Sequence, residues 1–150
     1  MSLIPKDPQF EVRVRQSFAR QTFMATLGAV LTRVAPGEVT IALPVREALL
    51  QQHGSVHAGA LASVLDSAAG YAALSLMPAG AGVVSVEFKV NLLEPAVGER
   101  VEARGRVVRS GRTLSVCTAE AWTLDATGTG RLVATLQGTM MCLVGSGRVD

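Results

Sequence analysis

The chain has 150 residues, a length that fits one domain and leaves no comfortable room for a second. Hydrophobic residues make up 49% of the sequence and charged residues only 17%, so we expect some apolar surface to be hidden between the subunits of an oligomer. The formal net charge of +2 is too small to indicate nucleic-acid binding.

Two further features narrow the class of protein. The first residues hold no apolar stretch before their charges, which favours a cytoplasmic protein. The apolar segment 59–77 contains Asp66 and three serines, and is therefore predicted to be a buried helix without stable membrane insertion. Cys117 and Cys142 lie in apolar runs without the spacing of metal ligands, which predicts two reduced, buried thiols.

The chain is expected to begin with a helix and a hairpin. Periodicity predicts a helix over residues 8–27, with one side formed by Phe10, Val14, Phe18 and Phe23. Two strands are predicted over 29–35 and 39–45, joined by a tight turn at Pro36 and Gly37. A loop over 51–57 then precedes a long helix that is expected to end near residue 76.

The second half of the chain is dominated by strand patterns. Strands are predicted over 85–92, 100–109, 112–125 and 131–143. The first of them alternates strictly, and its apolar side is expected to face the core with Val86, Phe88, Val90 and Leu92. A two-residue turn is predicted at Ser110-Gly111. Consecutive antiparallel strands after one long helix predict an α+β domain in which a curved sheet wraps the helix.

The most informative segment joins the loop to the long helix. It reads Q-Q-H-G-S-V-H-A-G over residues 51–59, and the small-residue helix that follows carries one acid, Asp66. A carboxylate in apolar surroundings loses solvation, so its pKa rises and it becomes a candidate base or nucleophile. The helix start near Ala58 offers unpaired backbone N–H groups to a carbonyl oxygen, and Gly54 and Gly59 leave room for its approach.

The two reactive groups of this segment are too far apart to cooperate within one chain. Asp66 follows Ala58 by eight residues, which corresponds to roughly 12 Å along a helix. If both groups act on one substrate, the helix start of one subunit must face Asp66 of another. The spacing therefore predicts an active site at a dimer interface.

Three motifs resemble a known family. They are G-S-V-H-A-G with nine positions from His57 to Asp66, S-V-E-F-K-V-N-L-L-E-P-A from Ser85, and R-S-G-R-T from Arg109. Over residues 23–143 the chain resembles the hot-dog-fold acyl-CoA thioesterases of the phenylacetate-pathway (PaaI-like) type. Its Q-Q-H-G-x-x-H-A-G motif is similar to the branch that acts on medium- and long-chain acyl-CoA.

The resemblance implies an α+β hot-dog domain over 27–145, an N-terminal helical arm over 1–26 and a tail over 146–150. It implies a homodimer, expected to form a dimer of dimers, that hydrolyses acyl-CoA to free acid and CoA. No cofactor is implied, because CoA is part of the substrate.

The resemblance also implies roles for individual residues. The nucleophile, or the base that activates water, falls on Asp66; the polarising backbone N–H falls on Ala58 of the opposite subunit; a hydroxyl that helps to hold the water falls on Ser85. The family frequently has Asn where this chain has Gln51, and commonly has Gly-Gly where this chain has Ala58-Gly59. The roles of Gln51 and Gln52 in catalysis or substrate binding are therefore open.

Histidines and arginines are the remaining polar candidates. His57 either contacts the substrate or orders the loop, and His53 and His57 with distant Asp66 make a poor ligand set, so no metal site is expected. Arg109 and Arg112 flank a glycine turn and suit the phosphates of CoA. A solvated strand face explains Arg104 and Arg106 equally well.

The acyl group and the reaction class leave alternatives open. Only 4% of residues are aromatic, and a pocket walled by Leu50, Leu61, Val64 and Met77 would suit a medium or long alkyl chain, with an aryl-acetyl group as the alternative. A hot-dog hydratase or dehydratase is a second alternative, although the motifs of those enzymes are absent. A noncatalytic acyl-CoA sensor is a third, but the residues before the first strand are too few for a helix-turn-helix unit.

Overall fold

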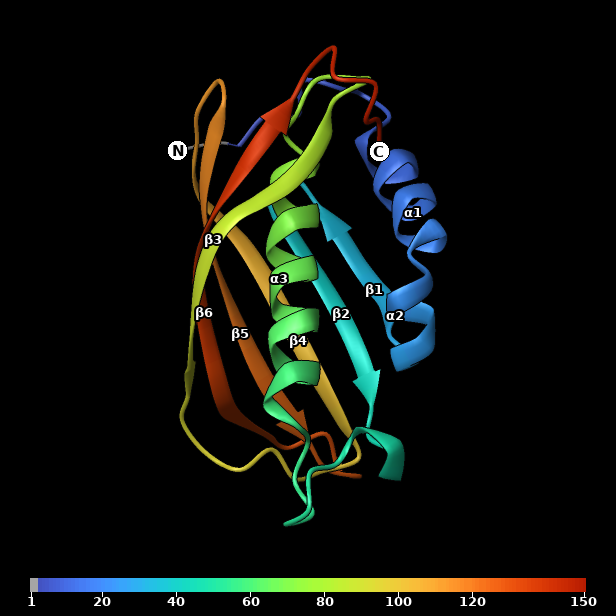
Figure 1. The fold of residues 1–150 in the computed structure, drawn as a ribbon, viewed down its shortest axis with the longest axis vertical. Helices are drawn as coiled ribbons and strands as arrows, with labels where there is room; N and C mark the ends of the chain where they lie inside the picture. The colour runs from blue at the N-terminus through green and yellow to red at the C-terminus, as the bar shows by residue number, and fades with distance from the viewer. Residues whose placement is uncertain (1–2) are drawn as a thin grey trace.

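A computed structural model describes residues 3–150 and shows a six-stranded antiparallel sheet that curves around one long helix (Figure 1). The strand order is β1-β2-β4-β5-β6-β3. The elements in chain order are α1 (Phe10–Arg20), α2 (Thr22–Leu27), β1 (Val30–Ala35), β2 (Glu38–Pro44), the short 3-10 helix η1 (Glu47–Leu49), α3 (Ala58–Leu74), β3 (Gly82–Leu92), β4 (Arg100–Ser110), β5 (Leu114–Leu124) and β6 (Gly130–Leu143). The predicted α+β architecture is confirmed.

Helix α3 lies close to the middle of the sheet because small residues meet there. Ala68, Ala69 and Ala72 are fully buried on the helix, and Gly105 is buried opposite them on β4. A Cβ atom at Gly105 would overlap with the backbone of Ala68 and Ala69. The short approach buries the sheet side of α3 and leaves its opposite face uncovered.

The predicted N-terminal helix is wrong in one respect, because it is broken at Gln21. Gln21 has an extended backbone, with φ −77° and ψ 95°, and separates α1 from α2. One straight helix over 8–27 would be roughly 30 Å long and could not follow the curved sheet. The break turns Met24 and Leu27 into the core, whereas Phe23, expected on the apolar side, is 56% exposed.

The apolar side of β3 does not face the core as predicted. Val86 is 52% exposed, Phe88 44% and Leu92 56%, and only Val90 packs against the core. A bulge between Ser85 and Glu87 breaks the strict alternation. The physical reason is that β3 is an edge strand with a neighbouring strand on one side only, so its side chains are covered less completely than those of the central strands.

The other expectations hold with small shifts. The turn at Pro36 and Gly37 is confirmed, with Gly37 at φ +72°, and α3 ends at Leu74 rather than near residue 76. The turn predicted at Ser110-Gly111 is instead a loop over 111–113, because Ser110 still pairs with Ser115.

The cysteine and membrane predictions can also be compared with the fold. Both cysteines are free thiols; burial raises the pKa of Cys117 to about 12, and Cys142 is half-buried. Among the helices of residues 3–150, none combines the length and apolar character of a membrane span.

Candidate active site

The N-terminal end of α3 has one open backbone donor. His57 caps the helix, because its Nδ1 atom accepts a hydrogen bond from the Gly59 N–H at 2.9 Å. The N–H groups of Ala60 and Leu61 donate to the carbonyl of His57. The Ala58 N–H has no partner within residues 3–150, and Ala58 is exposed. A carbonyl oxygen can therefore reach the Ala58 N–H, while the predicted role of Gly59 is limited by its bond to His57.

The loop before α3 is held by its own polar groups. The amide of Gln51 donates to Ser55 Oγ at 2.9 Å, and its oxygen accepts from the His53 N–H. Gly54 adopts φ +84°, a conformation that favours glycine. His53 and Gln52 are exposed, and their Nε2 atoms lie 3.4 Å apart. The side chain of Gln51 thus shapes the loop, and Gln52 remains free to meet a ligand.

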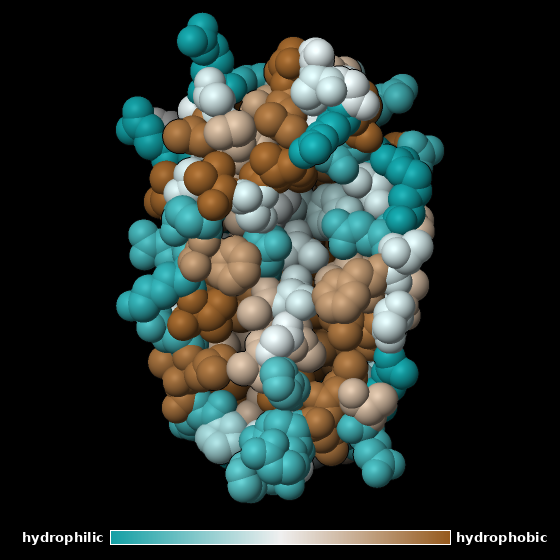
Figure 2. Space-filling view, viewed as in Figure 1, coloured by the Kyte–Doolittle hydropathy of each residue, from teal (hydrophilic) through white to brown (hydrophobic). Residues whose placement is uncertain are grey.

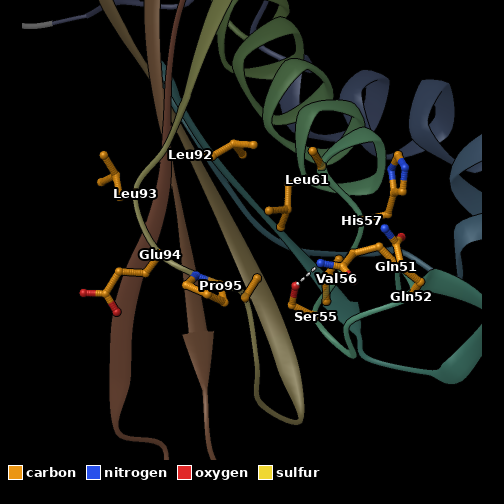
Figure 3. Close-up of a pocket in the computed structure, with 12 residues that line it drawn as sticks. Gln51, Gln52, Ser55, Val56, His57, Leu61, Leu92, Leu93, Glu94 and Pro95 are labelled. Carbon is orange, nitrogen blue, oxygen red and sulfur yellow. Dashed lines mark hydrogen bonds between the residues drawn. The ribbon is translucent and has the colours of Figure 1, made fainter.

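A cleft opens between this loop and the end of β3 (Figure 3). Its volume is about 460 Å³, and its apolar walls include Leu61, Leu92 and Leu93. Of the four aliphatic residues expected to wall a pocket, only Leu61 lines this cleft. Val64 and Met77, which are 0% and 4% exposed, are packed in the core because they lie on the covered sides of α3 and of the turn after it.

Asp66 lies about halfway along α3 and is joined to β3. Ser85 Oγ donates a hydrogen bond of 2.6 Å to Asp66 Oδ1, so the two residues predicted to work together do meet. Burial raises the pKa of Asp66 above its ordinary value, and the hydrogen bond from Ser85 opposes this rise. The carboxylate is half-buried and open to ligand from one side.

A second cavity, here called the polar chamber, surrounds Asp66. Its volume is about 200 Å³, and it is lined by Gln21, Asp66, Ser67, Gly70, Tyr71, Val83, Val84, Ser85 and Asp150. Figure 2 shows a hollow along this face, hydrophilic or pale along its floor and bordered by hydrophobic side chains. The chamber and the cleft at the helix start share no lining residue. Ala58 and Asp66 of one chain therefore belong to two separate cavities.

Sequence reasoning missed part of the polar chamber. Gly70 and Tyr71 follow Asp66 by about one helical turn, so helical spacing could have identified them. Ser17, Gln21 and Asp150 come from the two ends of the chain. No sequence signal links them to Asp66.

The predicted arginines lie at the other end of the sheet from the loop before α3. Figure 1 places the β4–β5 loop at the upper end of the molecule and residues 51–57 at the lower end. Arg109 and Arg112 are exposed and form no ion pair within residues 3–150. Arg100 and Arg104, by contrast, both pair with Glu102, and Arg104 lies 5.3 Å from the centre of the Trp122 ring.

Neither histidine belongs to a candidate metal site. Within the described part of the chain, no three His, Cys, Asp or Glu side chains are grouped to hold an ion.

Comparisons with known proteins agree with this geometry. Residues 53–129 match the thioesterase superfamily. Acyl-coenzyme A thioesterase 13 of Homo sapiens is 30% identical over 116 residues, which cover 76% of this chain and 80% of that protein. A putative esterase of Halobacterium salinarum is 33% identical over 98 residues, which cover 62% of this chain and 64% of that protein, slightly less than two thirds of its length.

Two solved structures are similar over nearly the whole chain. A thioesterase family protein from Silicibacter pomeroyi has a TM-score of 0.88 and 52% identity, and the match covers 91% of this chain and 99% of that one. The PaaI protein of E. coli, from the phenylacetic acid degradation operon, has a TM-score of 0.80 and covers 93% and 96%, but at 20% identity it supports the fold alone. The predicted hot-dog fold is confirmed.

Proposed function

Because the chain belongs to the thioesterase superfamily, we propose that it is an acyl-CoA thioesterase that cleaves its substrate to a free acid and CoA. The observation that carries this proposal is Asp66, a half-buried carboxylate with a raised pKa that Ser85 holds at the rim of an open chamber. Such a group is suited to act on a bound electrophile as a base or as a nucleophile.

The proposed active unit is a homodimer. Strand β3 is an uncovered edge of the sheet, and Val86, Phe88 and Leu92 expose apolar side chains along it. A bare apolar edge favours pairing with a second copy of the same chain. The separation of the chamber from the cleft supports the same arrangement, since a second copy can supply the helix start that Asp66 lacks.

Further association into a dimer of dimers is also proposed. The exposed side chains of Leu114 and Val116 give the outer side of the sheet apolar surface that β3 pairing would leave uncovered.

The reaction follows from the two groups that the dimer would bring together. The thioester oxygen accepts a hydrogen bond from the Ala58 N–H of one subunit, which polarises the carbonyl and stabilises the oxyanion. Asp66 of the other subunit removes a proton from a water near Ser85, the hydroxide adds to the carbonyl carbon, and the C–S bond breaks to release CoA thiolate, which then takes up the proton. Alternatively the Asp66 carboxylate attacks the carbonyl carbon directly, and the C–S bond breaks to release CoA thiolate and form a mixed anhydride. Water then hydrolyses the anhydride to the free acid and the Asp66 carboxylate, and the proton that is released goes to the thiolate.

The proposed substrate carries a medium or long alkyl chain. The low aromatic content and the apolar cleft with Leu61, Leu92 and Leu93 support this choice. The length of the acyl group depends on the cavity that receives it, because the polar chamber is smaller than the cleft. A compact aryl-acetyl group is the second candidate, and the small chamber beside Asp66 is the observation that favours it.

The nucleotide of CoA needs a basic surface outside the cavities. We propose Arg109 and Arg112 of the second subunit for its phosphates, because within one chain they lie at the opposite end of the sheet from the cleft. Their side chains are exposed and form no ion pair within residues 3–150. His57 and Gln52, at the mouth of the cleft, are proposed to contact the pantetheine arm.

Thiol release from a panel of acyl-CoAs tests the proposed function. The panel contains hexanoyl-, decanoyl-, palmitoyl- and phenylacetyl-CoA, assayed with wild type and Asp66→Asn. We expect wild type to release thiol and Asp66→Asn to be at least 100-fold slower. Equal rates for both proteins would refute the role of Asp66, and an unaltered thioester with an unsaturated acyl-CoA that gains water would indicate the hydratase alternative.

A further inference from the structure

The polar chamber has groups that the proposed reaction does not use. Besides Asp66 and Ser85, it is lined by Gln21 from the junction of α1 and α2, by Tyr71 from α3, and by Asp150. Tyr71 is only 3% exposed and packs edge-on against Phe18. Its position in the fold is therefore fixed, and its hydroxyl group is directed by its hydrogen-bond partner.

The hydroxyl protons of Ser17 and Tyr71 are both used within this cluster. Ser17 has a single hydroxyl proton, which it donates to Asp150 Oδ1 at 2.9 Å. In the 3.2 Å contact between the two hydroxyls, Tyr71 is therefore the donor and Ser17 the acceptor. The Val83 N–H donates to Asp150 Oδ2 at 2.6 Å. The side chain of Gln21 faces the Tyr71 hydroxyl and has a lowering effect on its pKa, which is that of a hydrogen-bond donor. The oxygen of Tyr71 and the carboxylate of Asp150 each keep a lone pair that can accept one more hydrogen bond.

The charged groups that line the chamber also favour a ligand that donates a hydrogen bond. Asp66 and Asp150 both line it, and within residues 3–150 no lysine or arginine does. The charge of Arg20 reaches Tyr71 from outside this lining, so the groups that a ligand would touch are acidic. A ligand group that donates a hydrogen bond gains from such a lining, whereas a carboxylate is repelled by like charge. An ammonium group would be attracted but would lose its hydration, so a hydroxyl is the donor that the chamber fits at least cost.

The size of the chamber limits what can enter it. Its volume of about 200 Å³ is less than half the 460 Å³ of the cleft at the helix start, so it admits only a compact group. The pantetheine arm of CoA continues into a nucleotide that must lie in solvent, so it needs an open passage and not a small chamber. The larger cleft of about 460 Å³ at the helix start suits the arm, which leaves the chamber to the acyl group.

We propose that the polar chamber is the acyl subsite and that it selects a compact acyl group ending in a hydroxyl, which donates to Tyr71 and Asp150. This inference rests on the proposed function and narrows it, because it assigns the cleft to the CoA arm instead of the acyl chain. It therefore favours hydroxylated acyl groups of medium length over long, wholly apolar chains. Tyr71 is then a specificity-determining residue, and Ser17 positions its proton.

Three matched thioesters test the inference without any change to the protein. They are hexanoyl-CoA, 6-hydroxyhexanoyl-CoA and adipoyl-CoA, which differ only in the group at the end of the chain. We expect wild type to prefer the hydroxyl over the methyl by roughly three- to tenfold in kcat/KM, the effect of one added hydrogen bond, and to turn over adipoyl-CoA more slowly than both. Equal values for the three substrates, or a preference for adipoyl-CoA, would overturn the inference.

Two variants identify the residue responsible. In Tyr71→Phe the ratio between the hydroxylated and the plain substrate is expected to fall toward one, and Ser17→Ala is expected to lower it as well, because Tyr71 then loses the acceptor of its proton. Thr26→Val, whose exposed hydroxyl bonds only to the Thr22 carbonyl, is expected to keep the wild-type ratio. An unchanged ratio in both Tyr71→Phe and Ser17→Ala contradicts the inference.

Failure of the inference is distinguishable from failure of the proposed function. A wild-type ratio near one together with an inactive Asp66→Asn variant would reject the acyl subsite and keep the thioesterase mechanism. Equal hydrolysis by wild type and Asp66→Asn would reject the mechanism, whatever the ratio.

Discussion

The two ends of α3 are finished in opposite ways. At the C-terminal end, Arg13 donates to the carbonyls of Leu74, Met77 and Pro78 at 2.9, 2.9 and 2.5 Å, and its charge is paired with Asp7 at 3.4 Å. At the N-terminal end, the Ala58 N–H is exposed and unpaired within residues 3–150. The N-terminal arm thus completes the end that stabilises the fold, and the end with the free donor is left for a ligand.

The largest expected effect comes from removing that free donor. Ala58→Pro deletes only the N–H, because proline is well tolerated at the first position of a helix and His57 already has an extended backbone. We expect kcat/KM for hexanoyl-CoA to fall by roughly 100- to 1,000-fold, the usual effect of one lost oxyanion donor. The melting temperature should stay close to that of wild type. Ala58→Gly keeps the N–H and serves as the control, with activity near wild type; equal activity of both variants would show that this end of α3 is not catalytic.

Mixing two inactive variants tests whether the open end serves the neighbouring subunit. Asp66→Asn and Ala58→Pro are each expected to be nearly inactive alone. In the proposed dimer, however, a mixed pair contains one site with both changes and one site with neither. After unfolding and refolding an equimolar mixture, we expect about a quarter of wild-type activity per subunit, since half of the dimers are mixed. No recovery in a mixture shown to contain mixed dimers would mean that both groups act within one chain.

The C-terminal end of α3, where Arg13 donates to three carbonyls, is expected to affect the stability of the fold more than its activity. Arg13→Ala removes one hydrogen bond from each of three carbonyls, although Leu74 and Pro78 keep a backbone donor. It also leaves Asp7 buried without its charged partner, so we expect the free energy of unfolding to fall by about 2–4 kcal/mol. Urea unfolding followed by circular dichroism measures this loss. Arg15→Ala is the matched control, because its exposed pair with Glu11 is worth at most about 0.5 kcal/mol. The activity of folded Arg13→Ala should match wild type; a large loss there would erase the contrast between the two ends.

The smallest expected effect concerns pH. In the proposed reaction Asp66 acts in its deprotonated form, so kcat/KM should rise with pH through the pKa of Asp66, which lies above the ordinary value of 3.8. The hydrogen bond from Ser85 lowers this pKa, and Ser85→Ala should therefore move the midpoint to higher pH.

The raised pKa of Asp66 also makes the stability of the folded state depend on pH. The folded state favours the protonated carboxyl of Asp66, so its contribution is fully present below the unfolded pKa and is lost as the pH rises through the folded pKa. Asp66→Asn should accordingly be more stable than wild type at neutral pH, with the difference vanishing in acid. A variant that is less stable at neutral pH would contradict the cost assigned to this carboxylate.

Local patterns predicted the elements of this chain well, and contacts between distant segments explain the errors. The long helix, the strands and the turn at Gly37 follow from periodicity and turn residues, and the pairing of Asp66 with Ser85 follows from the family motif. The exposure of Phe88 was not predictable from alternation, because alternation distinguishes two sides of a strand but does not reveal whether anything covers them. The break at Gln21 and the approach of Ser17 to Asp150 depend on the curvature of the whole sheet.

Gly105 is a position that redesign of this enzyme cannot change without moving α3. A side chain there would collide with the backbone of Ala68 and Ala69, and the helix could yield only by lifting off the sheet and carrying Asp66 out of reach of Ser85. New substrate preferences are therefore best sought by altering the junction at Gln21, where the polypeptide already bends. The contact between α3 and β4 at Gly105 should be left unchanged.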